Sequence, residues 1–299
     1  MRYYNLEKHE KSFMDNPVID SQKYELLATS QSWLFNLKPT VSKNYFYPEV
    51  TEKDIIVLHF TCGVLKGDIK TLTEDNNKVS VQYLVGRNGI VFQLYNPQYW
   101  AYHLGRTAVG GNTVNSKRSI AIEISNIGPL KKIGTTLKDI YGVDYCPEIE
   151  TEAYEISEYR GYTHFATYTE AQYDSLRKLI AYVQDDHNII DYYINNPEEA
   201  FLDRNEALAF KGICSHQNFR TDKADVGPAF DWDALKIIEG SEIGVGVDAP
   251  QGHIDIKGED TILPIVQGET YAPPPYAPPI PMPSFFETLM IILKNLFKK

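Results

Sequence analysis

Short apolar segments bounded by turn residues most strongly restrict how this chain can fold. Ile55–Phe60 and Ser119–Ile124 are rich in β-branched side chains and too short for a buried helix. Both are typical of buried strands. Val79–Val85 and Ile90–Tyr95 flank the sequence Gly-Arg-Asn-Gly at 86–89, and an Asn-Gly pair between apolar runs predicts a β-hairpin.

A longer segment, residues 169–187, has apolar side chains at helical spacing. Thr169 and Glu170 are typical of a helix start. A second helix is expected around Gln22–Phe35. Four or five strands with two or three helices predict an α/β fold, in which a mixed central β-sheet is flanked by helices.

The composition is that of a soluble globular protein, and its charge excludes one class of partner. A formal net charge of −11 argues against nucleic-acid binding, because phosphate contacts need clustered Lys and Arg. Cys62, Cys146 and Cys214 provide no disulfide framework, which fits synthesis in a reducing cytoplasm. The first residues contain no apolar run, so we expect no Sec signal. If the substrate lies outside the cytoplasm, the protein would reach it after release or injection.

The composition changes along the chain and predicts several regions. Residues 127–167 form a polar insertion that is too long for a simple connection, so it is either a functional loop or a decoration. The expected regions are an N-terminal extension (1–50), a main domain (51–240), a linker (241–283) that is proline-rich at 271–283, and a terminal amphipathic helix (284–299).

The terminal helix is predicted from its capping box, Ser284 and Glu287. Its sixteen residues fall short of the roughly 20 that a membrane-spanning helix needs. Its apolar face must therefore be buried on a membrane surface, on a partner such as a delivery apparatus, or on the main domain.

Two histidines and an aspartate form a candidate metal site. His59 ends the first core strand, and His216 follows the short strand at 211–215. Asp225 lies nine residues after His216, with Lys223 between them. Three protein ligands and a fourth position open to water are typical of catalytic zinc. An ordinary surface loop around His216 is the structural alternative.

The chain resembles the zinc-dependent type-2 N-acetylmuramoyl-L-alanine amidases, the family that includes phage lysozyme-type amidases and peptidoglycan recognition proteins. The resemblance runs from about Ile55 to about Leu235. Six segments carry it in order: Val57–Thr61, Val79–Gly89, Trp100–Gly105, Asn115–Glu123, Tyr159–Thr169 and Ser215–Trp232. Each segment alone is weakly specific, and their order makes the resemblance strong.

The resemblance implies roles for individual residues. His59, His216 and Asp225 would bind zinc, which lowers the pKa of water and polarises an amide carbonyl. Glu123 would take the proton from water and pass it to the leaving amine, and Lys223 would stabilise the oxyanion. Three further positions would contact the substrate: His103, Tyr83 and Asn115.

This chain also departs from the family pattern. Some relatives place a catalytic tyrosine where this chain has Val81, so Glu123 would carry that role alone. The loop from His216 to Asp225 is one residue shorter than in the cytoplasmic recycling enzymes, which leaves the position of Lys223 open. Cys62 and Cys214 lie close in sequence to the histidines. We interpret both as small core residues, with a cysteine ligand in place of Asp225 as the alternative.

The favoured function is hydrolysis of the amide between the lactyl group of N-acetylmuramic acid and L-alanine in peptidoglycan. One alternative is a peptidoglycan-binding module without catalysis. Another is an amidase-bearing component or cargo of a phage tail or contractile injection machine, which the proline-rich spacer and terminal helix suggest. The expected partners are peptidoglycan and, through 284–299, a membrane surface or a delivery apparatus.

Overall fold

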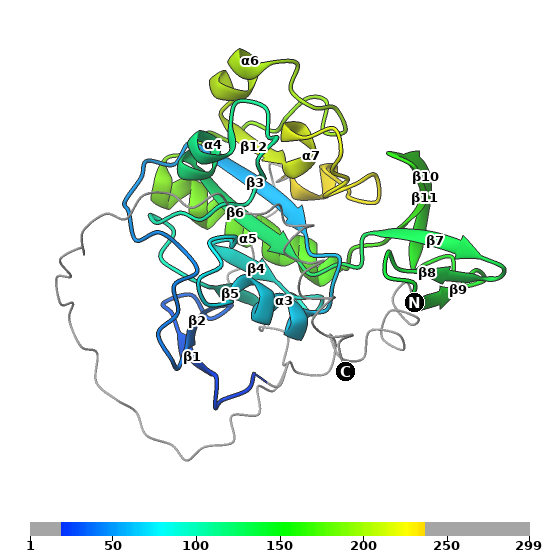
Figure 1. The fold of residues 1–299 in the computed structure, drawn as a ribbon, viewed down its shortest axis with the longest axis horizontal. Helices are drawn as coiled ribbons and strands as arrows, with labels where there is room; N and C mark the ends of the chain where they lie inside the picture. Colours follow the sequence, from blue (N-terminus) through cyan, green and yellow to red (C-terminus); the bar gives the residue numbers. More distant parts are fainter. Residues whose placement is uncertain (1–18, 237–299) are drawn as a thin grey trace. The chain divides into compact units, whose positions relative to one another are not determined.

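The computed structural model describes residues 19–236, and its centre is a seven-stranded β-sheet with strand order β1-β2-β5-β4-β6-β3-β12 (Figure 1). Strands β12, β3, β6 and β4 are parallel, whereas β5 is antiparallel to β4 and β1 is antiparallel to β2. The predicted mixed sheet is therefore confirmed. Its strands are β1 (Tyr24–Ala28), β2 (Leu34–Pro39), β3 (Ile55–Phe60), β4 (Tyr83–Val85), β5 (Val91–Gln93), β6 (Ser119–Ile124) and β12 (Gly212–Ser215).

Three of the sequence predictions for this sheet are confirmed, and one is wrong. The runs at 55–60 and 119–124 form β3 and β6, and β4 and β5 form the expected hairpin. The helix expected around Gln22–Phe35 is instead the β1–β2 hairpin. Thr29 explains part of this difference, because its hydroxyl accepts from the Gln31 amide and donates to the Leu34 carbonyl. Such local bonds compete with helix formation.

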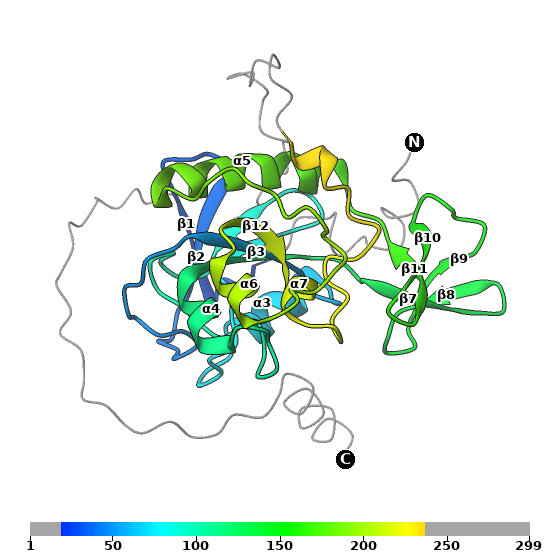
Figure 2. The same ribbon diagram turned by 90° about the horizontal axis from the view of Figure 1, so that it is seen from above.

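One face of the central sheet is covered by the long helix α5 (Glu170–His187), as Figure 2 shows. Thr169 caps it as predicted, in a capping box with Gln172. Its apolar side packs on Ile56 and Leu58 of β3 and on the matching residues of β6. The short helix η1 (Asp233–Leu235) joins the same core through Leu235.

The opposite face is covered by short helices. They are α3 (Leu65–Leu72), α4 (Asn112–Arg118), α6 (Arg204–Ala209) and α7 (His216–Phe219). Side chains alternate along β3, so Ile56 and Leu58 face α5 while Val57 packs into the core on the other side. His59 follows in the same alternation and therefore points away from α5.

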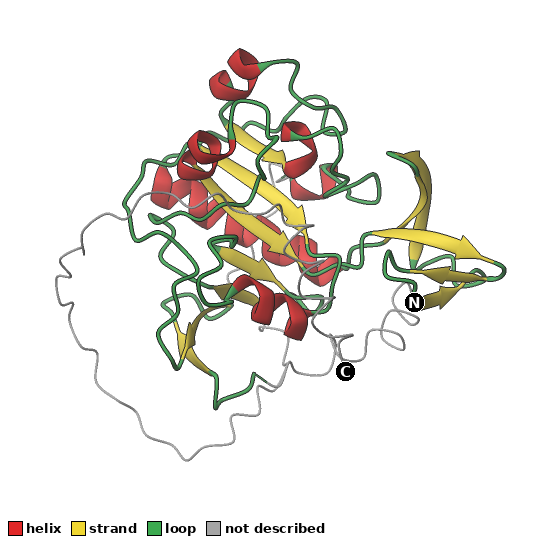
Figure 3. Cartoon of the chain, in the orientation of Figure 1, coloured by secondary structure: helices red, strands yellow, loops and turns green. Residues whose placement is uncertain are grey.

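Within the insertion at 127–167, the chain forms a separate five-stranded antiparallel sheet with strand order β10-β11-β7-β8-β9 (Figure 3). Its buried apolar residues include Leu130, Leu137 and Tyr145, which belong to the same apolar cluster as Leu84 and Phe92 of the central sheet. Its strands are β7 (Pro129–Ile133), β8 (Thr136–Lys138), β9 (Asp144–Pro147), β10 (Tyr154–Tyr159) and β11 (Tyr162–Ala166).

Several predictions lie outside the described residues: the linker from residue 241, the proline-rich spacer and the helix at 284–299. The boundary at residue 50 stays a prediction, and the central sheet continues across it through β1 and β2. Within residues 19–236, none of the helices combines the length and the apolar character that crossing a bilayer requires.

Candidate metal centre and active site

The parallel register of three neighbouring strands brings the candidate residues together. Ser215 of β12 pairs with Leu58 of β3, so the next residues, His216 and His59, are neighbours. His59 in turn pairs with Glu123 of β6. Side chains paired in register point to the same face of a sheet. The site therefore lies at the carboxyl ends of β12, β3 and β6, on the face opposite α5.

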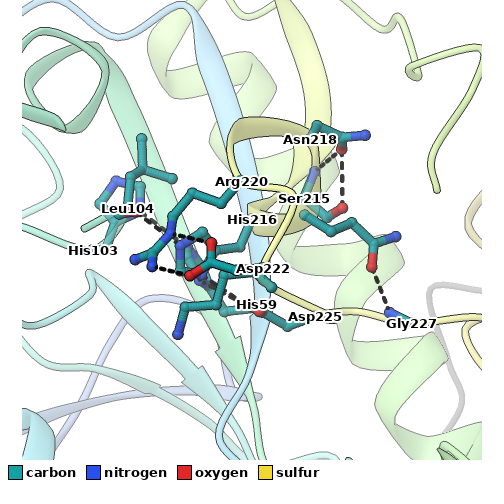
Figure 4. Close-up of polar contacts among 12 residues, drawn as sticks. His59, His103, Leu104, Ser215, His216, Asn218, Arg220, Asp222, Asp225 and Gly227 are labelled. Carbon is teal, nitrogen blue, oxygen red and sulfur yellow. Dashed lines mark hydrogen bonds and ion pairs between the residues drawn. The ribbon is translucent and has the colours of Figure 1, made fainter. Parts of the chain in front are cut away.

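Three donor atoms converge at this edge (Figure 4). The Nδ1 atoms of His59 and His216 are 3.1 Å apart. Asp225 Oδ2 lies 3.2 Å from His59 Nδ1 and 2.9 Å from His216 Nδ1. In a tetrahedral zinc site with bonds of about 2.0–2.1 Å, the ligand atoms are about 3.3 Å apart. The three atoms therefore have nearly the spacing that a small cation requires.

The surrounding hydrogen bonds determine which nitrogen of His59 carries a proton. The Ser119 hydroxyl donates to the Ser116 carbonyl, so its oxygen must accept from His103 Nε2, at 2.6 Å. His103 Nδ1 then accepts from His59 Nε2, at 3.0 Å. This chain of bonds leaves an unprotonated Nδ1 on His59, directed at the metal position.

His216 also directs its Nδ1 atom at the metal position. Its Nε2 lies 3.0 Å from the carbonyl oxygen of Leu104, which can only accept, so Nε2 carries a proton. Two imidazole nitrogens and a carboxylate oxygen thus face one another, with His216 Nδ1 and Asp225 Oδ2 at a hydrogen-bond distance of 2.9 Å. A bound cation would take the place of a proton shared at this distance. The donor set fits zinc.

Burial and charge favour the same protonation states. Burial lowers the pKa of His59 to about 4, so this side chain is neutral near pH 7. Burial by itself would raise the pKa of Asp225, but His216 and His59 hold it well below its usual range. Asp225 is therefore an anion, as a metal ligand must be.

The loop between His216 and Asp225 is closed by hydrogen bonds at both ends. The Gln217 amide donates to the Asp225 carbonyl at 3.0 Å, which joins the residue after one ligand to the other ligand. The Gln217 side chain accepts from the Gly227 amide. At the start of α7, Ser215 and Asn218 form a capping box. The ligand positions are therefore determined by the backbone around them.

Glu123 lies beside the donor atoms, and its environment suits proton transfer. Its Oε2 atom is buried and has no hydrogen-bond partner among the described residues. Burial, followed by the negative charges of Asp225 and Asp68, raises its pKa well above the usual range. A carboxyl group with a raised pKa can both take and release a proton near neutral pH.

Lys223 is close enough for its charge to act on this group of residues. Its positive charge contributes to lowering the pKa of both His59 and Glu123. The loop from His216 to Asp225 therefore keeps the ammonium group within electrostatic reach of His59 and Glu123.

Three residues expected to contact substrate are buried in this structure. His103 supports His59 from behind, as described above. Tyr83 is fully buried in the core with α5, and Asn115 donates to the carbonyls of Val109 and Gly111. All three side chains are therefore engaged inside the protein, and their contact with substrate stays a prediction.

The cysteine alternative is not favoured by the geometry. Cys214 is buried against the core of β3, and the cluster of donor atoms contains Asp225 and no sulfur. Burial also raises the pKa of the thiols of Cys62 and Cys214 well above the usual value, so neither is an available thiolate.

Sequence reasoning missed Ser119, Asp68 and Arg160. Ser119 completes the hydrogen-bond chain behind His59, and Asp68 is a buried carboxyl group in α3. Arg160 occupies a hairpin turn, and its neighbouring Gly161 was a signal for such a turn. Only tertiary structure shows what these side chains contact.

Comparison with known proteins identifies a family for this chain. A sequence model of a family described as N-acetylmuramoyl-L-alanine amidase matches residues 50–228, which is more than half of the chain. The comparison with curated proteins gave no match.

Among solved structures, the chain is similar to the amidase AmiD from E. coli, with 23% identity and a TM-score of 0.39 over 70% of this chain. The chain spans 64% of the length of AmiD, whose structure is a complex with the substrate anhydro-N-acetylmuramic acid-L-Ala-D-gamma-Glu-L-Lys. A derivative of AmpD is 17% identical, with a TM-score of 0.41 and coverage of 71% of this chain and 97% of that one.

LysC from Clostridium intestinale is 15% identical, with a TM-score of 0.36, and the match covers 67% of this chain and 93% of LysC. The assignment rests on the family match, because the structural likenesses are at low identity. By that match, the chain belongs to the N-acetylmuramoyl-L-alanine amidase family.

Proposed function

We propose that this protein is a zinc-dependent hydrolase of the amide bond between N-acetylmuramic acid and L-alanine in peptidoglycan. The observation that carries the proposal is the convergence of His59, His216 and Asp225 next to Glu123, in a chain that matches the amidase family. A metal position beside a carboxyl group of raised pKa is the arrangement that metal-assisted amide hydrolysis needs.

His59, His216 and Asp225 would hold the zinc ion. When bound, zinc supplies Lewis-acid chemistry, which lowers the pKa of water and polarises an amide carbonyl. Glu123 would accept the proton of the attacking water through its carboxylate and return it to the leaving nitrogen of L-alanine. Lys223 would place its positive charge near the oxygen on which negative charge develops.

The central test is mass spectrometry of muropeptides released from purified peptidoglycan. We expect products cut between the lactyl group and L-alanine, their loss in the presence of a chelator, and their recovery with added zinc. The matched variant is Asp225→Ala, which should lose both zinc retention and product formation, because one of three protein ligands is removed.

Two outcomes would contradict the proposal. Full zinc occupancy in Asp225→Ala would refute the ligand assignment. Retention on peptidoglycan without any released product, with zinc present, would favour a binding module instead.

The site of action and the role of the terminal segment are further parts of this proposal. We propose that the protein acts on the cell wall after release or injection, and that residues 284–299 bind a membrane surface or a delivery apparatus. Co-sedimentation of a 284–299 peptide with liposomes tests the membrane part. A peptide that stays in solution would eliminate it.

A further inference from the structure

Arg160 occupies the tip of the β10–β11 hairpin in an unfavourable backbone conformation. It has φ of 48° and is followed by Gly161 with φ of 82°, so the two residues form a tight turn between the paired Tyr159 and Tyr162. Turns with two positive φ angles favour Asn or Gly at the first position, because a larger side chain is strained there. An arginine at this position therefore needs a compensating interaction.

The guanidinium group supplies that interaction by donating to four backbone carbonyls. Nη1 donates to the carbonyls of Arg220 and Lys223. Nη2 donates to Gln217, at 3.1 Å, and to Glu198, at 3.3 Å. The neighbouring Tyr159 supports the group, since its ring lies 4.9 Å from the guanidinium carbon and its hydroxyl donates to the same Glu198 carbonyl.

Three of these four carbonyls belong to one short stretch of chain, residues 217–223. This stretch runs between the ligands His216 and Asp225 and includes Lys223 itself. The insertion leaves the central sheet shortly after Glu123 and returns to α5, while its hairpin tip reaches the metal-binding loop. The insertion sheet thus contacts the metal-binding loop through the side chain of Arg160.

We infer that Arg160 is a positioning residue, which holds the loop at 217–225 in the conformation that places Asp225 and Lys223. Through this residue, the insertion sheet stabilises the loop that carries the metal ligand Asp225. A planar fork of five N–H donors can bind several carbonyls at fixed angles, which a lysine ammonium group cannot do. The catalytic part of the inference rests on the proposed amidase function, whereas its metal-binding part does not.

The test separates the loop contacts from the stability of the hairpin. Arg160→Asn creates an Asn-Gly turn, which is the preferred sequence for this hairpin, and removes all four bonds to the loop. Arg160→Lys keeps the charge and loses the fork. Lys132→Ala is the matched control, because Lys132 is a cation of the same insertion sheet whose ion pair is with Glu148, also in the insertion.

Zinc affinity is measured by competition with a chelator on the full-length protein. We expect Arg160→Asn to bind zinc about 10- to 100-fold more weakly, as for other residues that orient metal ligands. The zinc affinity of Arg160→Lys should lie between those of Arg160→Asn and the original protein. The zinc affinity of Lys132→Ala should equal that of the original protein. Hydrogen exchange should be faster at amides 217–225 in Arg160→Asn and unchanged in β10 and β11.

Kinetics provide a further readout, in which Arg160→Asn should lower kcat with little change in KM. Unchanged zinc affinity and unchanged exchange in the loop of Arg160→Asn would overturn the inference. If that variant does not fold, the same two measurements on Arg160→Lys decide. If the original protein binds zinc but releases no product, the proposed function is refuted. The zinc-affinity and hydrogen-exchange measurements then still test the positioning role of Arg160.

Discussion

At the scale of single residues, the role of His59 depends on side chains buried behind it. His103 and Ser119 carry a line of hydrogen bonds to the Ser116 carbonyl, and that line directs a lone pair of His59 at the metal position. Outer partners of this kind orient a ligand and set its tautomer. The chemistry of the site is therefore distributed over buried polar residues behind the ligands.

His103 allows this dependence to be measured. We expect His103→Ala to weaken zinc binding about 10- to 100-fold, because His59 loses the acceptor that fixes its ring. His103→Gln should recover much of the affinity, since an amide can accept from His59 and donate to Ser119. Chelator competition measures the zinc affinity of both variants. Equal zinc affinities of His103→Ala and His103→Gln would contradict the positioning role of His103.

Glu123 is the second residue with a specific prediction. Glu123→Gln should lower kcat by about 100-fold or more, the usual contribution of a general acid–base group, and should leave zinc content unchanged because Glu123 is outside the donor set.

The pH profile of the same variant provides a control. Glu123 must be ionised to accept a proton, so activity of the original protein should rise with pH through a value above the usual range of glutamate. This rise should be absent from the profile of Glu123→Gln. An unchanged profile would assign the rise to another group.

At the scale of elements, α3 buries a carboxyl group beside the site. Asp68 Oδ2 accepts from the Ser125 hydroxyl at 2.6 Å, and burial raises the pKa of Asp68 to about 6 from 3.8 despite that bond. A folded pKa above the unfolded one means that the folded state binds the proton more tightly. The stability that this protonation contributes is present below about pH 4 and is lost as pH rises through about 6.

Asp68→Asn should remove this pH dependence. Relative to the original protein, the variant should gain free energy of unfolding between pH 4 and pH 7, by at most about 3 kcal/mol for a pKa difference of two units. Denaturant unfolding of both metal-free proteins across this range is the measurement. A constant difference between the two proteins would show that Asp68 does not titrate in this window.

Elements also differ in how far the sequence predicts them. Strands β3 and β6 could be predicted because both are continuous apolar runs, and α5 because its periodicity and its cap agree. The β1–β2 hairpin could not, because the turn at Thr29 and the pairing of Leu34 with Val91 decide its conformation. Propensity is a weak guide where tertiary pairing decides.

The candidate site was predictable to a similar degree. His59, His216 and Asp225 could be proposed because they lie at the end of an apolar strand or in the adjoining loop, and Glu123 because of the family resemblance. The burial of Tyr83 and the four contacts of Arg160 could not, since both depend on how distant segments pack.

At the scale of the whole molecule, the described part contains all of the proposed catalytic machinery. The metal donors, Glu123 and the insertion sheet lie within residues 19–236. Deleting residues 271–299 should therefore leave product release from isolated cell walls largely unchanged. Mass spectrometry of the muropeptides measures it. A large loss would show that the C-terminal segment takes part in catalysis or folding.

The register of β12, β3 and β6 has a thermodynamic consequence. His216, His59 and Glu123 are far apart in sequence and become neighbours only when three parallel strands align. The unfolded chain has no such cluster, so any ion that binds there is linked to folding and stabilises the native state by mass action. The melting temperature should consequently increase with zinc concentration, and loss of the ion should be an early sign that these strands have separated.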